Sequence, residues 1–252
     1  MSFNLRYASA AAPNSWPERR PVVKGLLRRE RPHLLGTQEG LYAQLRDIHR
    51  DLPSHYESIG LGRQGGSAGE AMQVFYDARR LDPQEYDHFW LSDTPAVMGS
   101  QSWGGCCPRM VTWVRFADLA TGAPFHAVNT HFEAFDATAR ENSARLLLER
   151  LPDGLPLVVT GDFNEPARAG ETVYDLLVSS GRLVDTWEAA ASRGPLYATA
   201  HDYRPPVPDG PRIDWILTSP EVTIRAASIN TYARNGQYPS DHLPVQAVVR
   251  LP

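Results

Sequence analysis

The sequence predicts a mixed α/β fold built from two packed β-sheets that are flanked by helices. Short apolar strands dominate the pattern, and helices lie between them without strict alternation of strand and helix. The length of 252 residues is enough to bury one substantial core, and folds built on paired sheets often form one domain at this length. We therefore expect residues 1–252 to form a single domain.

The first half of the chain contains two amphipathic helices with a strand between them. Apolar residues recur at helical spacing over residues 18–30 and 41–52, which predicts a helix in each segment. Pro21 is compatible with the first turn of the first helix. The short apolar strand that starts at Leu34 ends at Glu39, and functional residues often gather at such strand ends.

The remaining elements are short strands and helices separated by loops. Residues 60–69 are rich in glycine and predict a flexible loop. A second long loop covers residues 92–108, and loops of this length in compact domains are usually functional or disordered. The other predicted elements are a strand through 72–76, a strand from Met110, a turn at 121–122, a strand to His131, a helix through 146–151, a strand over 157–160, a helix near 171–179, and strands over 213–217 and 245–251.

Composition and charge limit the class of protein. The net charge of −4 argues against a broad basic surface for non-specific nucleic-acid binding, although it is compatible with a local basic groove. No run approaches the about 20 apolar residues of a membrane-spanning helix, so no transmembrane segment is expected. The default expectation is a cytoplasmic protein without an obligate protein partner, or a secreted one if an upstream signal peptide was removed.

The only two cysteines, Cys106 and Cys107, are adjacent. Adjacency makes an ordinary disulfide between them geometrically difficult. Two thiols without a Cys-x-x-Cys spacing are also too few for a structural zinc site of the thiolate type. We interpret them as small packing residues in a loop rather than as a redox pair.

Two polar residues follow the apolar strand over 157–160. Asp162 and Asn164 lie two positions apart, so in an extended turn both side chains can face the same cleft. A carboxylate there can orient or deprotonate water, and a neutral amide can hold a phosphoryl oxygen without adding repulsion. The alternative is a purely local role, because Asp and Asn favour turns.

Three further polar residues lie at strand ends. His131 ends a strand, and Glu70, which opens the strand after the glycine-rich loop, is the candidate carboxylate to orient it. Glu39 follows a strand and precedes a helix. An acid in that position can also stabilise the helix without any chemistry.

An acid and an imidazole, Asp241 and His242, lie side by side just before the final strand. Asp214 lies between two apolar residues in a predicted strand, where a carboxylate is costly to bury unless it is paired. A buried Asp214 oriented against His242 would satisfy both groups. The alternative for Asp214 is a structural ion pair with an arginine.

Six segments, in this order, resemble the motifs of the endonuclease/exonuclease/phosphatase (DNase I-like) superfamily and cover essentially the whole chain. They are Ser2-Phe3-Asn4-Leu5-Arg6-Tyr7, Gly36-Thr37-Gln38-Glu39, Asn129-Thr130-His131-Phe132, Gly161-Asp162-Phe163-Asn164, Arg212-Ile213-Asp214-Trp215 and Ser240-Asp241-His242-Leu243-Pro244. A bacterial subgroup is similar also at Phe89-Trp90-Leu91-Ser92 and at Pro108-Arg109. The resemblance implies a four-layer αββα sandwich, with two mixed sheets face to face, helices outside and a site at one edge.

The resemblance further implies hydrolysis of a phosphoester by in-line attack of water, with Mg²⁺ or Mn²⁺ as cofactor. Glu39 would be the principal metal carboxylate, and Asn4 and Asp241 would be further direct or water-mediated ligands. Asp162 would orient or activate the attacking water. Asn164 would bind the phosphoryl group.

Two imidazoles and one arginine complete the implied site. His242, held by Asp214, and His131, held by Glu70, would act on opposite sides of the phosphorus. Arg109 would be the phosphate-binding arginine.

The resemblance predicts the reaction but not the substrate, because the superfamily includes nucleases, deadenylases, inositol polyphosphate phosphatases and sphingomyelinases. We expect a phosphodiesterase or nuclease that acts on a nucleotide or a short single strand. The alternatives are a hydrolase of a small phosphorylated metabolite or lipid headgroup, and a catalytically silent binding module. Five aromatic residues could stack bases if they line the cleft, namely Trp16, Tyr42, Trp90, Trp103 and Tyr203.

Overall fold

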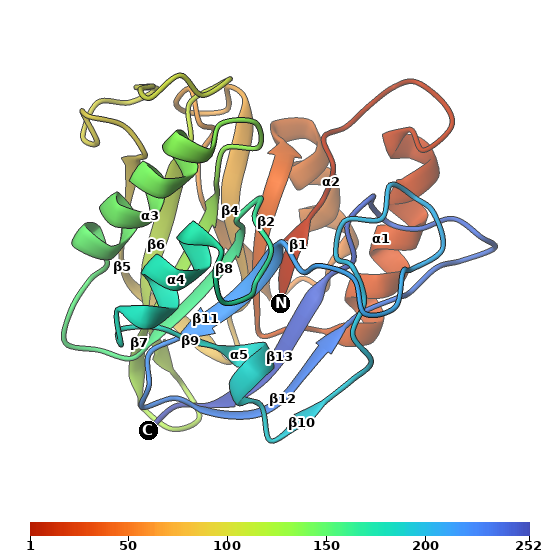
Figure 1. Cartoon of the computed structure of the whole chain (residues 1–252). Helices are drawn as coiled ribbons and strands as arrows, with labels where there is room; N and C mark the ends of the chain where they lie inside the picture. The colour runs from red at the N-terminus through yellow and green to blue at the C-terminus, as the bar shows by residue number, and fades with distance from the viewer.

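The computed structural model describes residues 1–252 and contains two mixed β-sheets packed face to face between layers of helices (Figure 1). This architecture confirms the predicted fold. The seven-stranded sheet has the order β10 (Ser192–Arg193), β12 (Thr223–Ile229), β13 (Val245–Arg250), β1 (Ser2–Asn4), β2 (Leu34–Leu41), β4 (Glu70–Asp77) and β3 (Tyr56–Ile59). The six-stranded sheet has the order β5 (Leu81–Trp90), β6 (Met110–Asp118), β7 (Pro124–His131), β8 (Leu157–Asp162), β11 (Asp214–Thr218) and β9 (Val184–Asp185).

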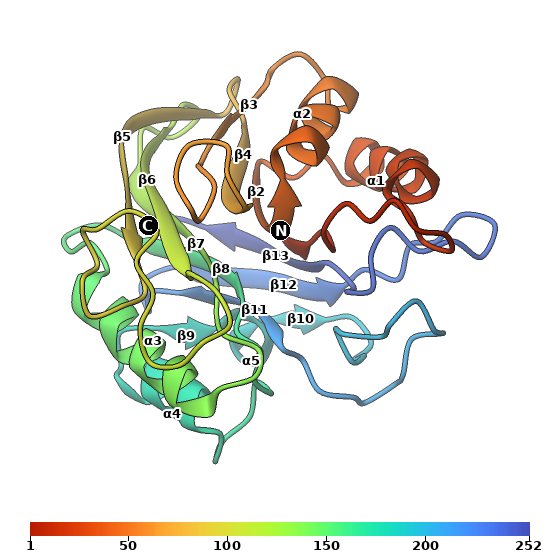
Figure 2. The ribbon, with the colours of Figure 1, turned by 90° about the horizontal axis from the view of Figure 1, so that it is seen from above.

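The main helices lie on the outer faces of the sheets, as the view from above shows (Figure 2). α1 (Trp16–Glu30) and α2 (Tyr42–Asp51) pack on the seven-stranded sheet, and α3 (Ala137–Arg150) and α4 (Thr172–Ser179) pack on the six-stranded sheet. The short α5 (Thr186–Ala189) follows β9. A third apolar cluster, which includes Val74, Phe116 and Ile216, fills the space between the two sheets. Each sheet therefore buries both faces, which gives four layers.

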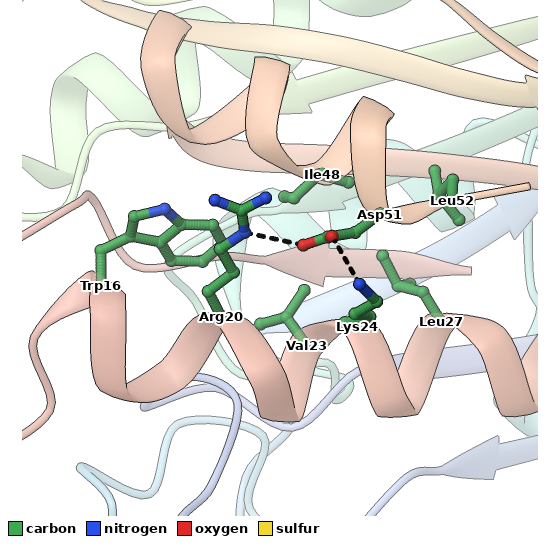
Figure 3. Close-up of a pocket in the computed structure, with 8 residues that line it drawn as sticks. All are labelled: Trp16, Arg20, Val23, Lys24, Leu27, Ile48, Asp51 and Leu52. Atoms are coloured by element: carbon green, nitrogen blue, oxygen red, sulfur yellow. Dashed lines mark hydrogen bonds and ion pairs between the residues drawn. The ribbon is translucent and has the colours of Figure 1, made fainter.

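Helices α1 and α2 are joined by both apolar and charged contacts (Figure 3). The carboxylate of Asp51 accepts hydrogen bonds from Arg20 Nε at 2.7 Å and from Lys24 Nζ at 2.9 Å. Helix α1 begins two residues before the predicted start, because Glu18 accepts a hydrogen bond from the Ser15 backbone N–H and closes the first turn. Pro21 therefore lies inside the helix and not in its first turn.

The two sheets approach each other closely below the candidate site. Asn129 on β7 donates its side-chain amide to the carbonyl oxygens of Thr37 at 2.8 Å and Gln73 at 3.1 Å on the opposite sheet. A Cβ atom at Gly36 would lie 2.0 Å from Thr160 Oγ1. Glycine at this position is therefore required for the close contact that brings polar residues of both sheets together.

Two long strands, β5 and β12, were not predicted from the sequence. β5 is mostly polar and exposed at the edge of its sheet, so it lacks the apolar alternation that predicts a strand, and β12 also went unpredicted. The long segment between β5 and β6 contains no helix or strand, in agreement with the predicted loop over 92–108. None of the helices combines the length and the apolar character that a membrane crossing requires.

Candidate active site

The candidate site lies where three neighbouring strands of the six-stranded sheet bring polar residues into line. His131 at the end of β7 is in register with Asp162 at the end of the parallel strand β8. Asp214 at the start of the antiparallel strand β11 is in register with Asp162 from the other side. Residues in register on adjacent strands point to the same face of a sheet, so the three side chains lie next to one another.

Asn4 connects this row to the opposite sheet. Its side-chain nitrogen donates to Glu39 Oε1 at 2.9 Å and to Asp162 Oδ2 at 2.8 Å. Glu39 has a φ of 61°, and the register of β2 shifts between Thr37 and Gly40. Such a bulge re-aims a side chain. The second carboxylate oxygen of Glu39 accepts from the backbone N–H of Tyr7 at 3.1 Å.

Asp162 is one of two deeply buried carboxylates in this group, and its side chain, like that of Asp214, is 1% exposed. Burial, followed by repulsion from Asp214, raises its pKa from 3.8 to about 7, although His242 and the hydrogen bond from Asn4 oppose this rise. The backbone N–H of Asn164 donates to its other oxygen at 3.0 Å. Asp162 is therefore an oriented carboxylate that can exchange a proton near neutral pH.

His242 is paired with Asp214, as the sequence predicts. The distance between His242 Nδ1 and Asp214 Oδ2 is 2.8 Å, and Asp162 Oδ2 lies 3.8 Å from the same nitrogen. Burial disfavours the imidazolium, but the two carboxylates outweigh it and raise the pKa of His242 well above its usual value. No protein atom is bonded to Nε2, so this nitrogen is free for a substrate.

His131 is held by Asn164 and not by Glu70, which corrects the prediction. Asn164 Nδ2 lies 3.0 Å from His131 Nε2, and Asp162 Oδ2 lies 3.5 Å from that nitrogen. Glu70 instead accepts a hydrogen bond from Arg63 Nη1 at 2.7 Å. The reason is that the glycine-rich loop before β4 folds back and places the Arg63 guanidinium against Glu70, whose charge it neutralises.

The pKa of His131 is shifted in the opposite direction to that of His242. Burial, with the positive charge of Arg109 added to it, lowers the pKa of His131 well below its usual value. The imidazole is therefore neutral near pH 7. Since the Asn164 amide donates to Nε2, the proton lies on Nδ1, which is buried without a hydrogen-bond partner.

Asn164 has less freedom to bind a phosphoryl group than predicted. Its side-chain nitrogen donates to His131 and, at 3.0 Å, to the carbonyl oxygen of Phe132. An amide nitrogen has two hydrogens, and both are used within the protein. The phosphoryl contact would require one of these bonds to be given up, so the geometry favours a positioning role for Asn164.

Asp241, predicted as a further metal ligand, lies beside Arg6. Its Oδ2 is 3.5 Å from Arg6 Nε, and it makes no hydrogen bond with Asn4 or Glu39. Burial lowers the pKa of Arg6, but Asp241 and Glu39 together outweigh this and raise it. Both acids thus lie close enough to Arg6 to share its positive charge.

The sequence analysis did not identify two residues that lie beside the site, Glu133 and Arg63. The carboxylate of Glu133, which is 2% exposed, lies 3.4 Å from Arg109 Nε. Arg63 is fixed by Glu70 and by the indole of Trp90, which donates to the Arg63 carbonyl oxygen at 2.6 Å. Arg63 Nε and Arg109 Nη1 are buried without a partner, as is His131 Nδ1. The only signal available for Arg63 was its position in the glycine-rich loop over residues 60–69, which the sequence analysis predicted only to be flexible.

Ligand atoms of Asp162, Asp214 and His242 all lie within 4.8 Å of one another. The two carboxylates could hold a cation, whereas the protonated imidazole of His242 has no lone pair free to bind one. The carboxylates of Asp162, Asp214 and Glu39 offer oxygen atoms, which Mg²⁺ and Mn²⁺ prefer. Asn4, predicted as a further ligand, instead turns its amide nitrogen toward Glu39 and Asp162, and its Oδ1 accepts from the backbone N–H of Arg6. A cavity of about 720 Å³ lies elsewhere, lined by β12 and β13 together with residues of β2, β8 and other elements, and by none of the candidate catalytic residues.

Comparison with known proteins identifies the family of this chain. The sequence model described as "Endonuclease/Exonuclease/phosphatase family" matches residues 1–242. The chain belongs to this family. It is accordingly a phosphoester hydrolase, as predicted from its motifs. No curated protein matches the sequence.

Several solved structures are similar to this chain in both fold and sequence. A mannosyl-6-phosphatase of Bacteroides thetaiotaomicron is similar at 33% identity, with 99% of this chain and 98% of that chain covered and a TM-score of 0.92. A family protein of Bacteroides vulgatus is 32% identical over 100% of this chain and 97% of that chain, also with a TM-score of 0.92. The human nocturnin catalytic domain is 18% identical over 99% of this chain and 91% of that one, with a TM-score of 0.74, which shows the fold alone.

Proposed function

We propose that this protein is a divalent-metal-dependent phosphatase that hydrolyses a small phosphorylated sugar. The main support for hydrolysis is the row formed by His131, Asp162 and Asp214 on adjacent strands. His242 is bonded to Asp214, and Asn4 connects Asp162 to Glu39. The similarity to a mannosyl-6-phosphatase over nearly the whole of both chains supports the substrate class.

The two arginines beside the site favour a phosphomonoester over a phosphodiester. Arg109 is 9% exposed and Arg63 is 17% exposed, and both retain nitrogen donors that no protein atom uses. A monoester carries up to two negative charges on three terminal oxygens, whereas a diester carries one charge on two. Oriented guanidinium groups bind such oxygens in pairs, so two of them suit the more highly charged group.

The sequence-based preference for a nucleic-acid substrate has less support. Trp16 and Trp90, two of the five aromatic residues available for base stacking, are 7% and 4% exposed and pack inside the fold. The Trp16 indole donates to Asp47 between α1 and α2. Tyr42 is exposed at the start of α2. A stacking platform is therefore not supported by Trp16 and Trp90.

The donor set fits a hard divalent cation. Glu39, Asp162 and Asp214 would hold Mg²⁺ or Mn²⁺, with Asn4 connecting Glu39 to Asp162, and Asp241 would reach the ion through water. Asp214 Oδ1 is buried without a hydrogen-bond partner, as expected for an oxygen that a cation or a water would satisfy. The bound cation would neutralise phosphate charge and polarise an oxygen of the substrate.

The protein's own residues supply proton transfer and orientation. Asp162 accepts a proton from the attacking water. Its burial, which raises its pKa in the metal-free protein, makes it a stronger base than an exposed carboxylate. His242 is the imidazolium, because Asp214 keeps it charged, and it stabilises negative charge on phosphorus or donates a proton through Nε2. Neutral His131 acts as a donor through Nδ1, with Asn164 fixing its tautomer.

A substrate panel tests this proposal. Mannose 6-phosphate, glucose 6-phosphate, bis-p-nitrophenyl phosphate and single-stranded oligonucleotides are incubated with Mg²⁺, Mn²⁺ or chelator, using the wild type and His242→Ala. We expect chelator-sensitive release of inorganic phosphate from the sugar phosphates and its loss in the variant. Faster cleavage of the oligonucleotides would overturn the substrate assignment. Turnover that survives both the chelator and the substitution would overturn the mechanism.

A further inference from the structure

The adjacent cysteines lie on a bend that turns both thiols toward one acid. Cys106 Sγ is 2.9 Å from Cys107 Sγ and 3.3 Å from Glu133 Oε2. Successive side chains of an extended chain point in opposite directions, so this convergence requires the bend that the loop makes at these two residues. Cys106 is exposed and Cys107 is half-buried, which does not fit the packing role expected from the sequence.

We propose that Cys106, Cys107 and Glu133 form a second cation site, which takes a thiophilic divalent ion of the Zn²⁺ or Cd²⁺ type. Their ligand atoms all lie within 4.8 Å of one another. Thiolates select such ions, whereas Mg²⁺ prefers oxygen, so this site and the oxygen-rich site at Glu39 would take different metals. Three protein ligands leave a fourth position for water.

The charges around the thiols fit the arrival of a cation. Two thiolates and a carboxylate carry three negative charges, a divalent ion leaves one, and the guanidinium of Arg109 beside Glu133 balances it. Burial, followed by the neighbouring Cys107, raises the pKa of Cys106 to about 12. Binding therefore displaces the two thiol protons to the solvent, and affinity increases with pH.

The sequence argument excluded a zinc site because it counted thiols alone. The third ligand comes from the segment that follows β7, and the fold brings it to the loop before β6. Glu133 also accepts hydrogen bonds from the backbone N–H groups of Cys106 at 3.2 Å and Phe135 at 3.1 Å, so its carboxylate is held in place.

Cation binding by Glu133 would also change the site described above. Glu133 is the acid that contacts Arg109, which the proposed function assigns to the substrate phosphate. An ion on the thiols would compete for this carboxylate and alter the position of Arg109. We therefore expect thiophilic ions to modulate turnover, a consequence that rests on the proposed function.

A spectroscopic titration tests the site without using activity. The full chain, reduced with a phosphine and kept in excess Mg²⁺, is titrated with Cd²⁺ while thiolate-to-metal charge-transfer absorption is recorded. The chain has only two cysteines, so any such absorption reports them. We expect saturation at one Cd²⁺ per chain, no absorption in Cys106→Ser/Cys107→Ser, and affinity reduced by about tenfold or more in Glu133→Gln.

Two controls separate the site from other effects. Glu39→Gln should keep the full absorption, because it leaves the thiols and Glu133 intact, and near-ultraviolet circular dichroism checks the fold of each variant. Saturation at half an equivalent with dimer formation would overturn the proposal, since the thiols would then bridge two chains. The absence of charge-transfer absorption in the wild type would overturn it as well.

Discussion

The imidazole of His242 is bonded through Nδ1 to the carboxylate of Asp214 at 2.8 Å, while Asp162 lies 3.8 Å from the same nitrogen. The His242 imidazolium thus lies between two buried carboxylates, and the pKa of each of the three groups depends on the charges of the other two. Asp214 keeps His242 protonated and at the same time raises the pKa of Asp162. The carboxylate of Asp214 therefore shifts the pKa of both the proposed base, Asp162, and the proposed acid, His242.

The first prediction concerns Asp214→Asn. Loss of the negative charge lowers the pKa of His242, so activity that needs the imidazolium is lost at a lower pH than in the wild type. We expect kcat to fall by about 10²-fold or more, the usual contribution of a positioned acid or base. The pH dependence of kcat and an NMR titration of His242 are the measurements. An unchanged alkaline limb would show that Asp214 does not set the charge of His242.

The second prediction concerns stability in the presence of a chelator. The folded pKa of Asp162 is raised from 3.8 to about 7, so the folded protein binds the proton more tightly than the unfolded chain. The stability contributed by the protonated acid is complete below pH 3.8 and is lost as pH rises through about 7. Urea unfolding of the wild type and Asp162→Asn across this range measures it.

The variant cannot titrate at this position, so its free energy of unfolding should increase relative to the wild type as pH rises. A shift from 3.8 to about 7 makes this difference about 4 kcal/mol at neutral pH. Excess Mg²⁺ should reduce it, because a bound cation favours the ionised carboxylate. Parallel pH dependence of the two proteins would contradict the raised pKa.

The third prediction concerns substrate charge. Arg63→Gln removes one guanidinium, so kcat/KM for a sugar phosphate should fall by about 10- to 10²-fold, the worth of a hydrogen bond to a charged group. The loss for bis-p-nitrophenyl phosphate should be smaller, because a diester carries less charge. Arg46→Gln is the matched control, since Arg46 is an exposed arginine on α2. If kcat/KM fell equally for both substrates, Arg63 would not discriminate between them by their charge.

Some contacts of the site could be predicted from the sequence for a physical reason. Asp214 begins a buried strand, and a carboxylate there requires a partner, so its pairing with His242 follows from the cost of burying charge. The order of the motifs predicts the four-layer fold only through the resemblance to the superfamily. Burial predicted that Asp214 has a partner and left His242 or an arginine as candidates, and the structure shows His242.

The contacts made by loops could not be predicted in the same way. Glu70 pairs with Arg63 instead of His131 because the glycine-rich loop folds back onto its own strand, and no periodic pattern encodes that path. Glu133 is next to Arg109 only in three dimensions. The exposed strand β5 was missed because it lacks an apolar face. These features depend on tertiary contacts that sequence spacing does not reveal.

The fourth prediction tests the close approach of the two sheets. In Gly36→Ala the new Cβ would lie 2.0 Å from Thr160 Oγ1 and 2.6 Å from Asn129 Oδ1, so the strands must separate. Overpacking of this kind costs about 1–3 kcal/mol, and separation would also move Asn4 and Glu39 away from Asp162. We therefore expect a lower Tm together with reduced turnover at temperatures where the variant is folded.

Gly194→Ala is the matched control, because its Cβ would lie 3.4 Å from Ser228 Cβ, which is ordinary contact, and its backbone is not left-handed. This substitution should leave both Tm and turnover nearly unchanged. Adding Thr160→Ala to Gly36→Ala should recover part of the lost stability, since it removes the nearest clashing atom but leaves Asn129 in place. A Gly36→Ala variant as stable and active as the control would mean that the sheets can separate without disturbing the residues that join them.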